Sequence, residues 1–335
     1  MVRKNLLKVR SDYWDNLKGI LILLVVIAHF MQRNDISRVL YDAIYMFHMP
    51  LFIFVSGVFH KNTNIKERIL GLVLIGIVYN ASLILVDNVI LKMDQDFYLF
   101  RATKIPWFVF TLAICAAITY VVRECNELVI LIISLFLGII ACYDANLMQY
   151  MVLSKTVGWF FFYYLGVIVR RGDIETLTKR TSVRAFWGGG MLLVFLSIVI
   201  FGRNSALNIS QVSFLDGVQA TYPSMDVKWA LVKLLYYVGV IVISMAVISL
   251  APHKKIVVLT ELGRKTMPIY FWHIIVRSIV FHTGIQNYFY STYLGNIIWA
   301  LVSAAIAVIL TMKPFEFPTK YILDGLHVLS TEKDK

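Results

Sequence analysis

Ten apolar blocks, most of them about 17 to 24 residues long, follow one another along this chain of 335 residues. A helix of about 20 residues spans the roughly 30 Å of hydrocarbon in a bilayer. In hydrocarbon the backbone N–H and C=O groups find no water, so a spanning segment must be a helix or part of a closed β-barrel. Barrel strands alternate apolar and polar residues, whereas these blocks are continuously apolar, so each block is predicted to be a helix. The predicted fold class is all-α, a polytopic membrane bundle of about ten transmembrane helices. The blocks lie approximately at residues 19–32, 39–60, 69–91, 106–122, 127–143, 148–169, 184–202, 229–251, 267–285 and 293–312.

Composition supports a membrane protein. Hydrophobic residues make up 59% of the sequence and charged residues only 16%, whereas soluble domains carry roughly 25% charged residues. No stretch between the blocks is long enough for a soluble domain, so residues 1–335 are predicted to form a single membrane domain. No small-residue cleavage pattern follows Phe30, so the first block is predicted to remain as a span. The three cysteines form no metal-type pair, and no metal site is predicted.

The distribution of basic residues predicts the orientation of the helices. Ten spans place both termini on one side. With that side in the cytoplasm, inner segments hold 22 of the 32 Lys and Arg residues and outer segments hold 7. Cytoplasmic loops are rich in Lys and Arg, so both termini are predicted to be cytoplasmic. This topology explains the net charge of +12, and no nucleic-acid partner is predicted. The remaining basic residues, Lys155, Lys233 and Arg277, lie within blocks.

Charged and titratable side chains inside a span are costly, so each one is a candidate functional residue. Lys18 and His29 are separated by ten residues, which places them about 16 Å apart along one helix. An imidazole can take a proton from a hydroxyl near neutral pH, and a lysine at the membrane surface can attract phosphates. The alternative interpretation makes Lys18 an interfacial lysine and His29 a hydrogen-bonded histidine at a helix end.

Three further segments carry candidate residues. His48 lies just before Pro50 in the second block, where a bent helix favours a cavity, and Ser56 is followed by a glycine that permits close helix approach. His273 and Arg277 share one face of the ninth block. Both segments also have a purely structural interpretation. The first would be a helix kink with a buried His48, and the second an internal pair of His273 and Arg277. Trp107-Phe108 opens the fourth block, and the favoured interpretation there is an interfacial aromatic belt.

These segments together resemble the membrane acyltransferase-3 family, the O-acyltransferases of bacterial surface polysaccharides. Lys18-x10-His29 is similar to the Arg/Lys-x10-His signature of that family, and residues 47–57 are similar to its Phe-His-Met-Pro-Leu-Phe motif followed by Ser-Gly. Trp107-Phe108 resembles its Trp-Phe-Leu motif, and residues 263–273 resemble its late Gly-x-x-Ser/Thr and Tyr-x-x-His segment. The matches follow the expected order.

One departure affects the donor site. Members of the family often carry Arg-x-x-Arg at the start of the third span, whereas this chain has Arg68 followed by Gly71. Lys66 is the nearby residue that could substitute for the second arginine.

The resemblance implies an enzyme of the bacterial cytoplasmic membrane that moves an acetyl group from cytoplasmic acetyl-CoA to a hydroxyl of a glycan or lipid-linked glycan at the outer face. Acetyl-CoA is then a substrate, no bound cofactor is expected, and membrane lipid surrounds the bundle. His29 is the expected base or transient acyl carrier, with His48 as a second catalytic residue. The other expected roles are donor binding by Lys18, Arg68 and Lys66, and pocket lining by Trp107, His273, Arg277 and Ser56.

Two other functions compete with this interpretation. In a transporter of a glycan, lipid or small anion, the histidines would form an ion path, although no repeated half with a matching broken helix is present. The second is a catalytically inactive membrane scaffold, which the histidine motifs argue against, because a scaffold would not need them. The sequence does not distinguish direct transfer from a ping-pong route, and it names neither the acceptor nor the oligomeric state.

Overall fold

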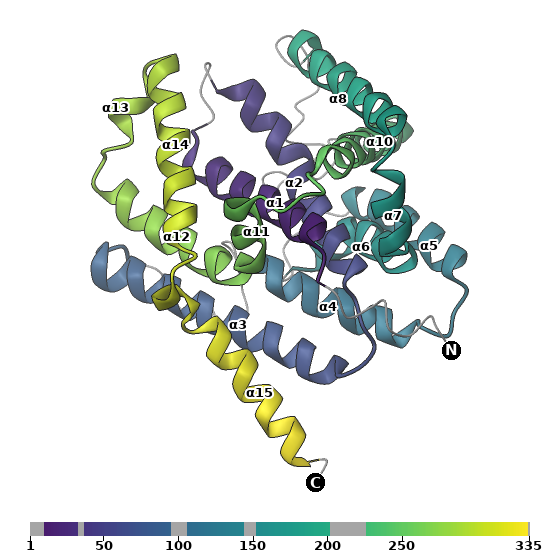
Figure 1. The fold of residues 1–335 in the computed structure, drawn as a ribbon, viewed down its shortest axis with the longest axis horizontal. Coiled ribbons are helices and arrows are strands. Elements are labelled where there is room, and N and C mark those ends of the chain that lie inside the picture. Colours follow the sequence, from purple (N-terminus) through teal and green to yellow (C-terminus); the bar gives the residue numbers. More distant parts are fainter. Residues whose placement is uncertain (1–9, 33–36, 95–105, 144–151, 202–225, 334–335) are drawn as a thin grey trace.

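A computed structural model describes residues 10–32, 37–94, 106–143, 152–201 and 226–333, which form helices and no strand (Figure 1). The long helices are α1 (Asp12–Phe30), α2 (Arg38–Val58), α3 (Ile65–Leu85, continued by the π-helical turn η1, Val86–Ile90), α4 (Trp107–Val121), α5 (Glu127–Ile140), α6 (Leu153–Ile168), α8 (Thr181–Phe201), α10 (Val227–Leu250), α12 (Thr266–His282) and α14 (Tyr293–Ile309). Shorter or peripheral segments are η2 (Ala141–Tyr143), α7 (Arg171–Leu177), α11 (Val257–Arg264), α13 (Asn287–Tyr290), η3 (Lys313–Glu316) and α15 (Thr319–Lys333).

The predicted fold class is confirmed, because every predicted apolar block coincides with a long helix. Within the described ranges, four helical segments are long and apolar enough to cross a membrane: α1, the part of α2 from Leu40 to Val58, α3 together with η1, and α10. The shorter apolar helices include α4, α5, most of α8, and α14. The first helix begins at Asp12, well before the first apolar block, which starts near residue 19.

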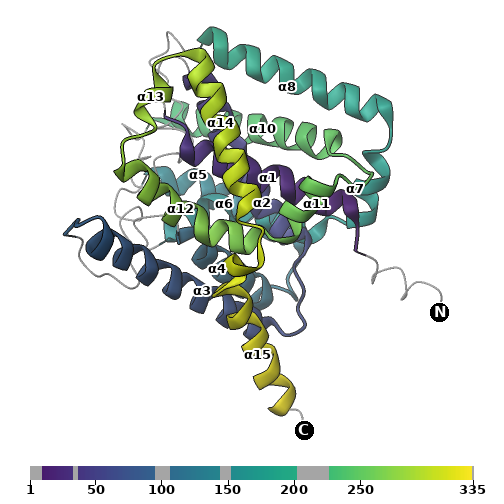
Figure 2. The ribbon, with the colours of Figure 1, turned by 60° about the vertical axis from the view of Figure 1, so that its left-hand side comes forward.

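Helix α1 lies inside the bundle and packs against α2, α11, α12 and α14 (Figures 1 and 2). Its buried residues cover most of the circumference of the helix, among them Leu17, Ile22 and Phe30, which is typical of a helix largely surrounded by protein. In contrast, large apolar side chains such as Phe186 of α8 and Leu301 of α14 are exposed. Exposed apolar faces of this kind suit contact with lipid tails.

Helices α2 and α6 approach each other at two glycines. A Cβ atom on Gly57 would lie 2.0 Å from the Tyr163 carbonyl oxygen, and one on Gly166 would lie 2.1 Å from the Phe54 carbonyl oxygen. Any side chain at either position would force the helices apart. Gly57 therefore serves close packing between the helix that carries His48 and the helix that begins near Lys155. Ser56 instead donates to the Phe52 carbonyl oxygen at 2.9 Å and lines the larger of the two cavities described below, as predicted for a pocket residue.

The C-terminal tail, which follows the last apolar block, forms η3 and α15. Figure 2 shows α15 extending away from the bundle, and it packs against α3. Glu316 of η3 pairs with Lys265 at the start of α12, and the Trp272 indole donates to the Phe317 carbonyl oxygen at 2.7 Å. These contacts attach the tail beside the entrance of a cavity, which Leu323 helps to line.

Candidate active site

Two adjoining cavities lie along α1. The larger cavity, about 390 Å³, is lined by Lys18 and Arg68 together with mostly apolar residues. The smaller one, which we call the histidine chamber, has a volume of about 90 Å³ and is lined by His29, His48 and Lys155. Four side chains line both cavities and therefore form the wall between them: Val25, Met49, Phe108 and Tyr270. The structure thus places Lys18 and His29 at opposite ends of one path, as the ten-residue spacing predicted.

His29 lies at the C-terminal end of α1, and the surrounding residues fix its position. Its Nδ1 atom is 3.3 Å from the Tyr45 hydroxyl, and its ring centroid is 5.3 Å from that of His273. The Arg277 Nε atom donates to the His29 carbonyl oxygen at 2.5 Å. His273 and Arg277, which the sequence predicted as pocket-lining residues on one face of a helix, thus lie beside His29 but line neither cavity.

The end of α1 shows why Arg277 is needed. The last carbonyl groups of a helix have no partner within the helix, and hydrocarbon offers no water in their place. Besides the bond from Arg277, the Tyr290 hydroxyl and the Trp299 indole nitrogen donate to the Phe30 carbonyl oxygen at 2.7 and 2.8 Å. Arg277 is therefore a positioning residue that caps α1 beneath His29, and the sequence could not reveal this backbone partner.

His48 has a defined tautomer. Its Nδ1 atom lies 2.7 Å from the Ile44 carbonyl oxygen, which can only accept, so Nδ1 carries the proton and a neutral ring leaves Nε2 as a base. Pro50 has no N–H for the Met46 carbonyl oxygen four residues earlier. The Tyr236 hydroxyl of α10 donates to that oxygen at 2.9 Å. The predicted distortion of α2 beside the chamber is thus stabilised by a tyrosine from another helix.

His273 is fully buried behind His29. Its Nδ1 atom donates to the Ile269 and Tyr270 carbonyl oxygens at 3.1 and 2.8 Å, while its Nε2 atom is buried and makes no hydrogen bond in the described structure. In the neutral ring Nε2 is therefore the unprotonated nitrogen, and His273 does not line the chamber.

Trp107 lies in the histidine chamber and not only at an interface, so the favoured belt interpretation misses its main contact. The Lys155 Nζ atom is 4.1 Å from the centroid of the Trp107 ring, and Trp159 packs on the same ring at 5.0 Å. Sequence analysis did not assign a role to Lys155. The available signal was a lysine inside an apolar block, one helical turn before a tryptophan.

Three cations surround Phe59 beside the larger cavity. The Lys18 Nζ atom and the Arg171 guanidinium carbon lie 5.1 and 4.7 Å from the centre of its ring, and Arg68 Nη1 donates to its carbonyl oxygen at 3.2 Å. Phe59 and two of these cations line the cavity. Lys66, the predicted substitute for a second arginine, is exposed and does not line it. Arg171 of α7 comes to this place from a hundred residues away in sequence, which no local pattern could predict.

Gly71 also has a physical explanation. A Cβ atom at this position would lie 3.0 Å from a methyl group of Leu323 on α15. A longer side chain such as arginine would press on the Leu323 side chain, which would have to move away from α3. The departure from the family pattern therefore accompanies the docking of α15.

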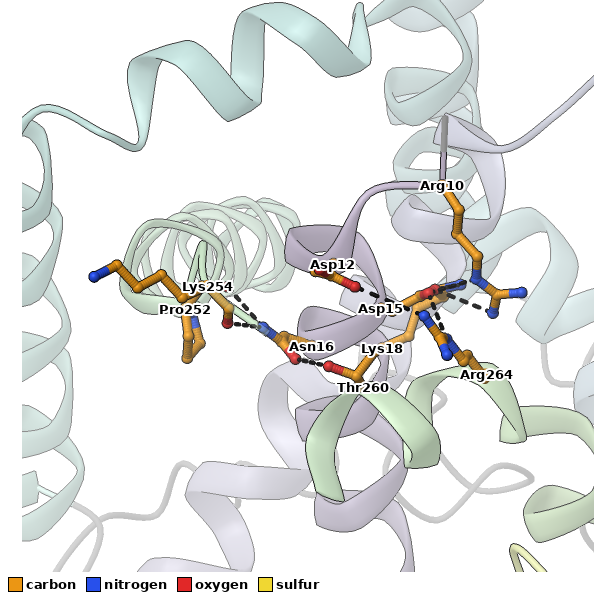
Figure 3. Close-up of polar contacts among 9 residues, drawn as sticks. All are labelled: Arg10, Asp12, Asp15, Asn16, Lys18, Pro252, Lys254, Thr260 and Arg264. Carbon is orange, nitrogen blue, oxygen red and sulfur yellow. Dashed lines mark hydrogen bonds and ion pairs between the residues drawn. The ribbon is translucent and has the colours of Figure 1, made fainter. Parts of the chain in front are cut away.

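Lys18 is held in place by a buried carboxylate, as Figure 3 shows. Asp15 is 2% exposed and lies 2.7 Å from Lys18 Nζ, 2.5 Å from Arg10 Nε and 3.4 Å from Arg264 Nε. Lys18 retains 21% exposure, so the Asp15 pair does not close it off from a ligand in the cavity.

Helix α11 brings Arg264 to this cluster. A Cβ atom on Gly263 would lie 1.7 Å from the Asp15 carbonyl oxygen, so only glycine allows this approach. Asn16 secures the contact by donating to the Pro252 and Lys254 carbonyl oxygens at 2.9 and 2.8 Å (Figure 3). It also accepts a hydrogen bond of 2.7 Å from Thr260. The glycine of the late sequence segment thus has a packing role that positions the donor-side cations.

The apolar helices of the described ranges are those of a multi-pass membrane protein. A family model described as an acyltransferase domain matches residues 11–312, and the chain belongs to this family. The resemblance to the acyltransferase-3 family is thereby confirmed over almost the whole chain.

A curated relative matches more locally. Nodulation protein NolL of Sinorhizobium fredii (strain NBRC 101917 / NGR234) is 45% identical over 64 residues, which cover 17% of this chain and 18% of that protein. The match therefore spans less than a fifth of the length of NolL. No solved structure matches this chain.

Proposed function

We propose that this protein is an O-acetyltransferase that moves an acetyl group from cytoplasmic acetyl-CoA to a hydroxyl of a glycan or lipid-linked glycan on the other side of the membrane. One observation carries the proposal: a cavity with cations at its entrance adjoins a chamber with two histidines, and both lie along α1. The excess of basic residues in the loops on the Lys18 side supports a cytoplasmic entrance for the donor, in a bacterial inner membrane with both termini inside.

The donor end suits a phosphorylated thioester. Guanidinium and ammonium groups form strong, charge-assisted hydrogen bonds with phosphate oxygens. Lys18, Arg68 and Arg171 converge on Phe59 from three helices, so together they can hold the phosphates of acetyl-CoA. The mostly apolar wall of the larger cavity then accommodates the pantetheine arm, which points the acetyl group towards His29.

The histidine end suits transfer to an alcohol. In a direct route, His29 takes the proton of the acceptor hydroxyl while the oxygen attacks the thioester carbonyl, and the C–S bond then breaks to release the CoA thiolate. The imidazolium returns its proton to that thiolate. In a ping-pong route, a ring nitrogen of His29 attacks the thioester carbonyl, the C–S bond breaks, and CoA leaves as the thiolate, which takes the proton of the acetylated ring. The acceptor oxygen then attacks the acetyl carbonyl, the N–acetyl bond breaks, and the hydroxyl proton returns to the ring. His48 offers a second base in the same chamber, and the wall between the cavities must open in either route.

The test uses purified protein in lipid nanodiscs with acetyl-CoA labelled in the acetyl group. We expect saturable binding of acetyl-CoA, and release of CoA on addition of a glycan mixture in proportion to a base-labile labelled ester. The His29→Ala variant should bind acetyl-CoA but form no ester. Movement of glycan across liposomes without any use of acetyl-CoA would refute the enzyme and support a transporter. Label retained on the protein with donor alone would select the ping-pong route.

A further inference from the structure

Lys155 is the cation of the histidine chamber, and the proposed mechanism gives it no task. It lies in the first turn of α6 and lines the same chamber as His29 and His48. A lysine near the end of a membrane helix ordinarily extends its ammonium group towards water. The side chain of Lys155 instead places its Nζ atom over the Trp107 ring at 4.1 Å.

The ammonium group has a fixed position. Trp107 at the start of α4 provides the ring face that attracts the cation. Trp159, one turn after Lys155 on α6, packs on Trp107 at 5.0 Å and holds that ring. Such an arrangement keeps the charge at one point of the chamber wall, so it can select among ligands.

The charge lacks an anion. No carboxylate lies within ion-pair distance of Lys155 in the described part of the chain, and the chamber lining contains no Asp or Glu. An ammonium group removed from water is costly unless an anion pairs with it, and a cation–π contact offsets only part of that cost. The chamber is therefore incomplete without a negatively charged ligand group.

The size and place of the chamber indicate which ligand provides that group. A volume of about 90 Å³ accommodates one edge of a sugar with its substituents but not a whole glycan. The phosphates of the donor have their own cations near Phe59, at the opposite end of the path. The partner of Lys155 must therefore come with the acceptor.

We propose that Lys155 binds an anionic substituent of the acceptor, a carboxylate or a phosphate near the hydroxyl that is acetylated, so that the acceptor is an acidic glycan. This inference rests on the proposed acetyltransferase function. Lys155 acts as a specificity-determining residue: its ammonium group pairs with the anion and thereby directs the neighbouring hydroxyl towards His29.

The test uses two matched probes, methyl glucuronoside and methyl glucoside, which differ only in a carboxylate against a hydroxymethyl group. We expect methyl glucuronoside to raise the Tm of the purified wild-type protein by roughly 2 °C at saturation, and methyl glucoside to have no such effect. Lys155→Met should lose the shift, whereas Lys155→Arg should keep it. The control Lys228→Met removes an exposed lysine at the start of α10 and should also keep it. Methyl glucoside 6-phosphate distinguishes phosphate from carboxylate as the preferred anion.

Three outcomes would overturn the inference. Equal shifts with the charged and neutral probes would mean that the chamber does not select an anion. A glucuronoside shift that persists in Lys155→Met would place the anion elsewhere. An equal loss of acetyl-CoA turnover in Lys155→Met with acidic and neutral acceptors would assign the lysine to the oxyanion of the transferred acyl group. Binding of acetyl-CoA, measured in every variant, verifies the fold, and its absence in wild type would refute the proposed function instead.

Discussion

Arg171 offers the sharpest test of the donor end, because the neighbouring arginine supplies a matched control. Arg171 is partly buried over the Phe59 ring, whereas Arg170 is exposed. We therefore compare Arg171→Gln with Arg170→Gln, two changes that remove the same charge one position apart. Only the first removes a cation from the group around Phe59.

The expected magnitude follows from the surroundings of the side chain. A hydrogen bond between charged groups contributes about 1.5–3 kcal/mol. Arg171 keeps some exposure to water, which screens its charge, so the lower end of that range applies. A loss of about 1.4 kcal/mol corresponds to a roughly tenfold increase in Kd. The same substitution at Arg170 should change Kd by less than about twofold, because exposed charges contribute little.

The assay is equilibrium binding of CoA to each variant in nanodiscs, repeated with pantetheine, which lacks the nucleotide and its phosphates. Arg171→Gln should weaken CoA binding and leave pantetheine binding unchanged. Rising salt should weaken CoA binding to wild type more than to this variant, because one charge contact is missing. Equal CoA affinity in wild type and Arg171→Gln, or equal weakening by both glutamine variants, would refute the assignment of Arg171 to the donor.

Three further predictions concern stability. Gly263→Ala should lower the free energy of unfolding by about 1–3 kcal/mol, since its Cβ atom would lie 1.7 Å from the Asp15 carbonyl oxygen, and an unchanged Tm would contradict the packing of α11 on α1. Tyr236→Phe leaves the buried Met46 carbonyl oxygen without a donor and should cost about 1–3 kcal/mol in a thermal unfolding assay; Tyr288→Phe, at an exposed tyrosine, is the control. Burial lowers the pKa of His60, which lies between α2 and α3, so the unfolded chain binds its proton more readily. The contribution of His60 to the free energy of unfolding should therefore be complete above about pH 6.5 and be lost as the pH falls below that value. In His60→Gln the free energy of unfolding should depend less on pH in this range.

The sequence predicted the helices well because a membrane span depends on the length of one continuous apolar block, which can be read directly from the sequence. An apolar block of sufficient length must be helical in hydrocarbon whatever its neighbours are. The spacing of Lys18 and His29 also follows from helical rise alone, so their places at two ends of one path could be expected. The helix α15 was not among the predicted helices, because its sequence is too polar to form an apolar block.

Contacts between distant segments could not be predicted in the same way. Arg171 approaches Phe59, and Arg277 reaches the His29 carbonyl oxygen, only once α7 and α12 have packed against their neighbours. No function was predicted for Lys155, because a lysine near the end of a span ordinarily lies at the membrane interface. Its place in the lining of the histidine chamber became known only from the structure. Lys66 is the opposite case: its proximity in sequence to Arg68 predicted a shared donor site, and its position on α3 leaves it exposed and outside the lining of the larger cavity.

The central claim is that an acetyl group passes from CoA on one side of the membrane to a hydroxyl on the other by way of His29. Its most direct test uses inside-out membrane vesicles that carry wild type or His29→Ala at equal protein level, loaded with an acidic polysaccharide and supplied outside with labelled acetyl-CoA. We predict that label accumulates inside as a base-labile ester with wild type and not with the variant. Ester formation that is equal in both would contradict the role of His29, and label that never enters the wild-type vesicles would contradict transfer across the membrane.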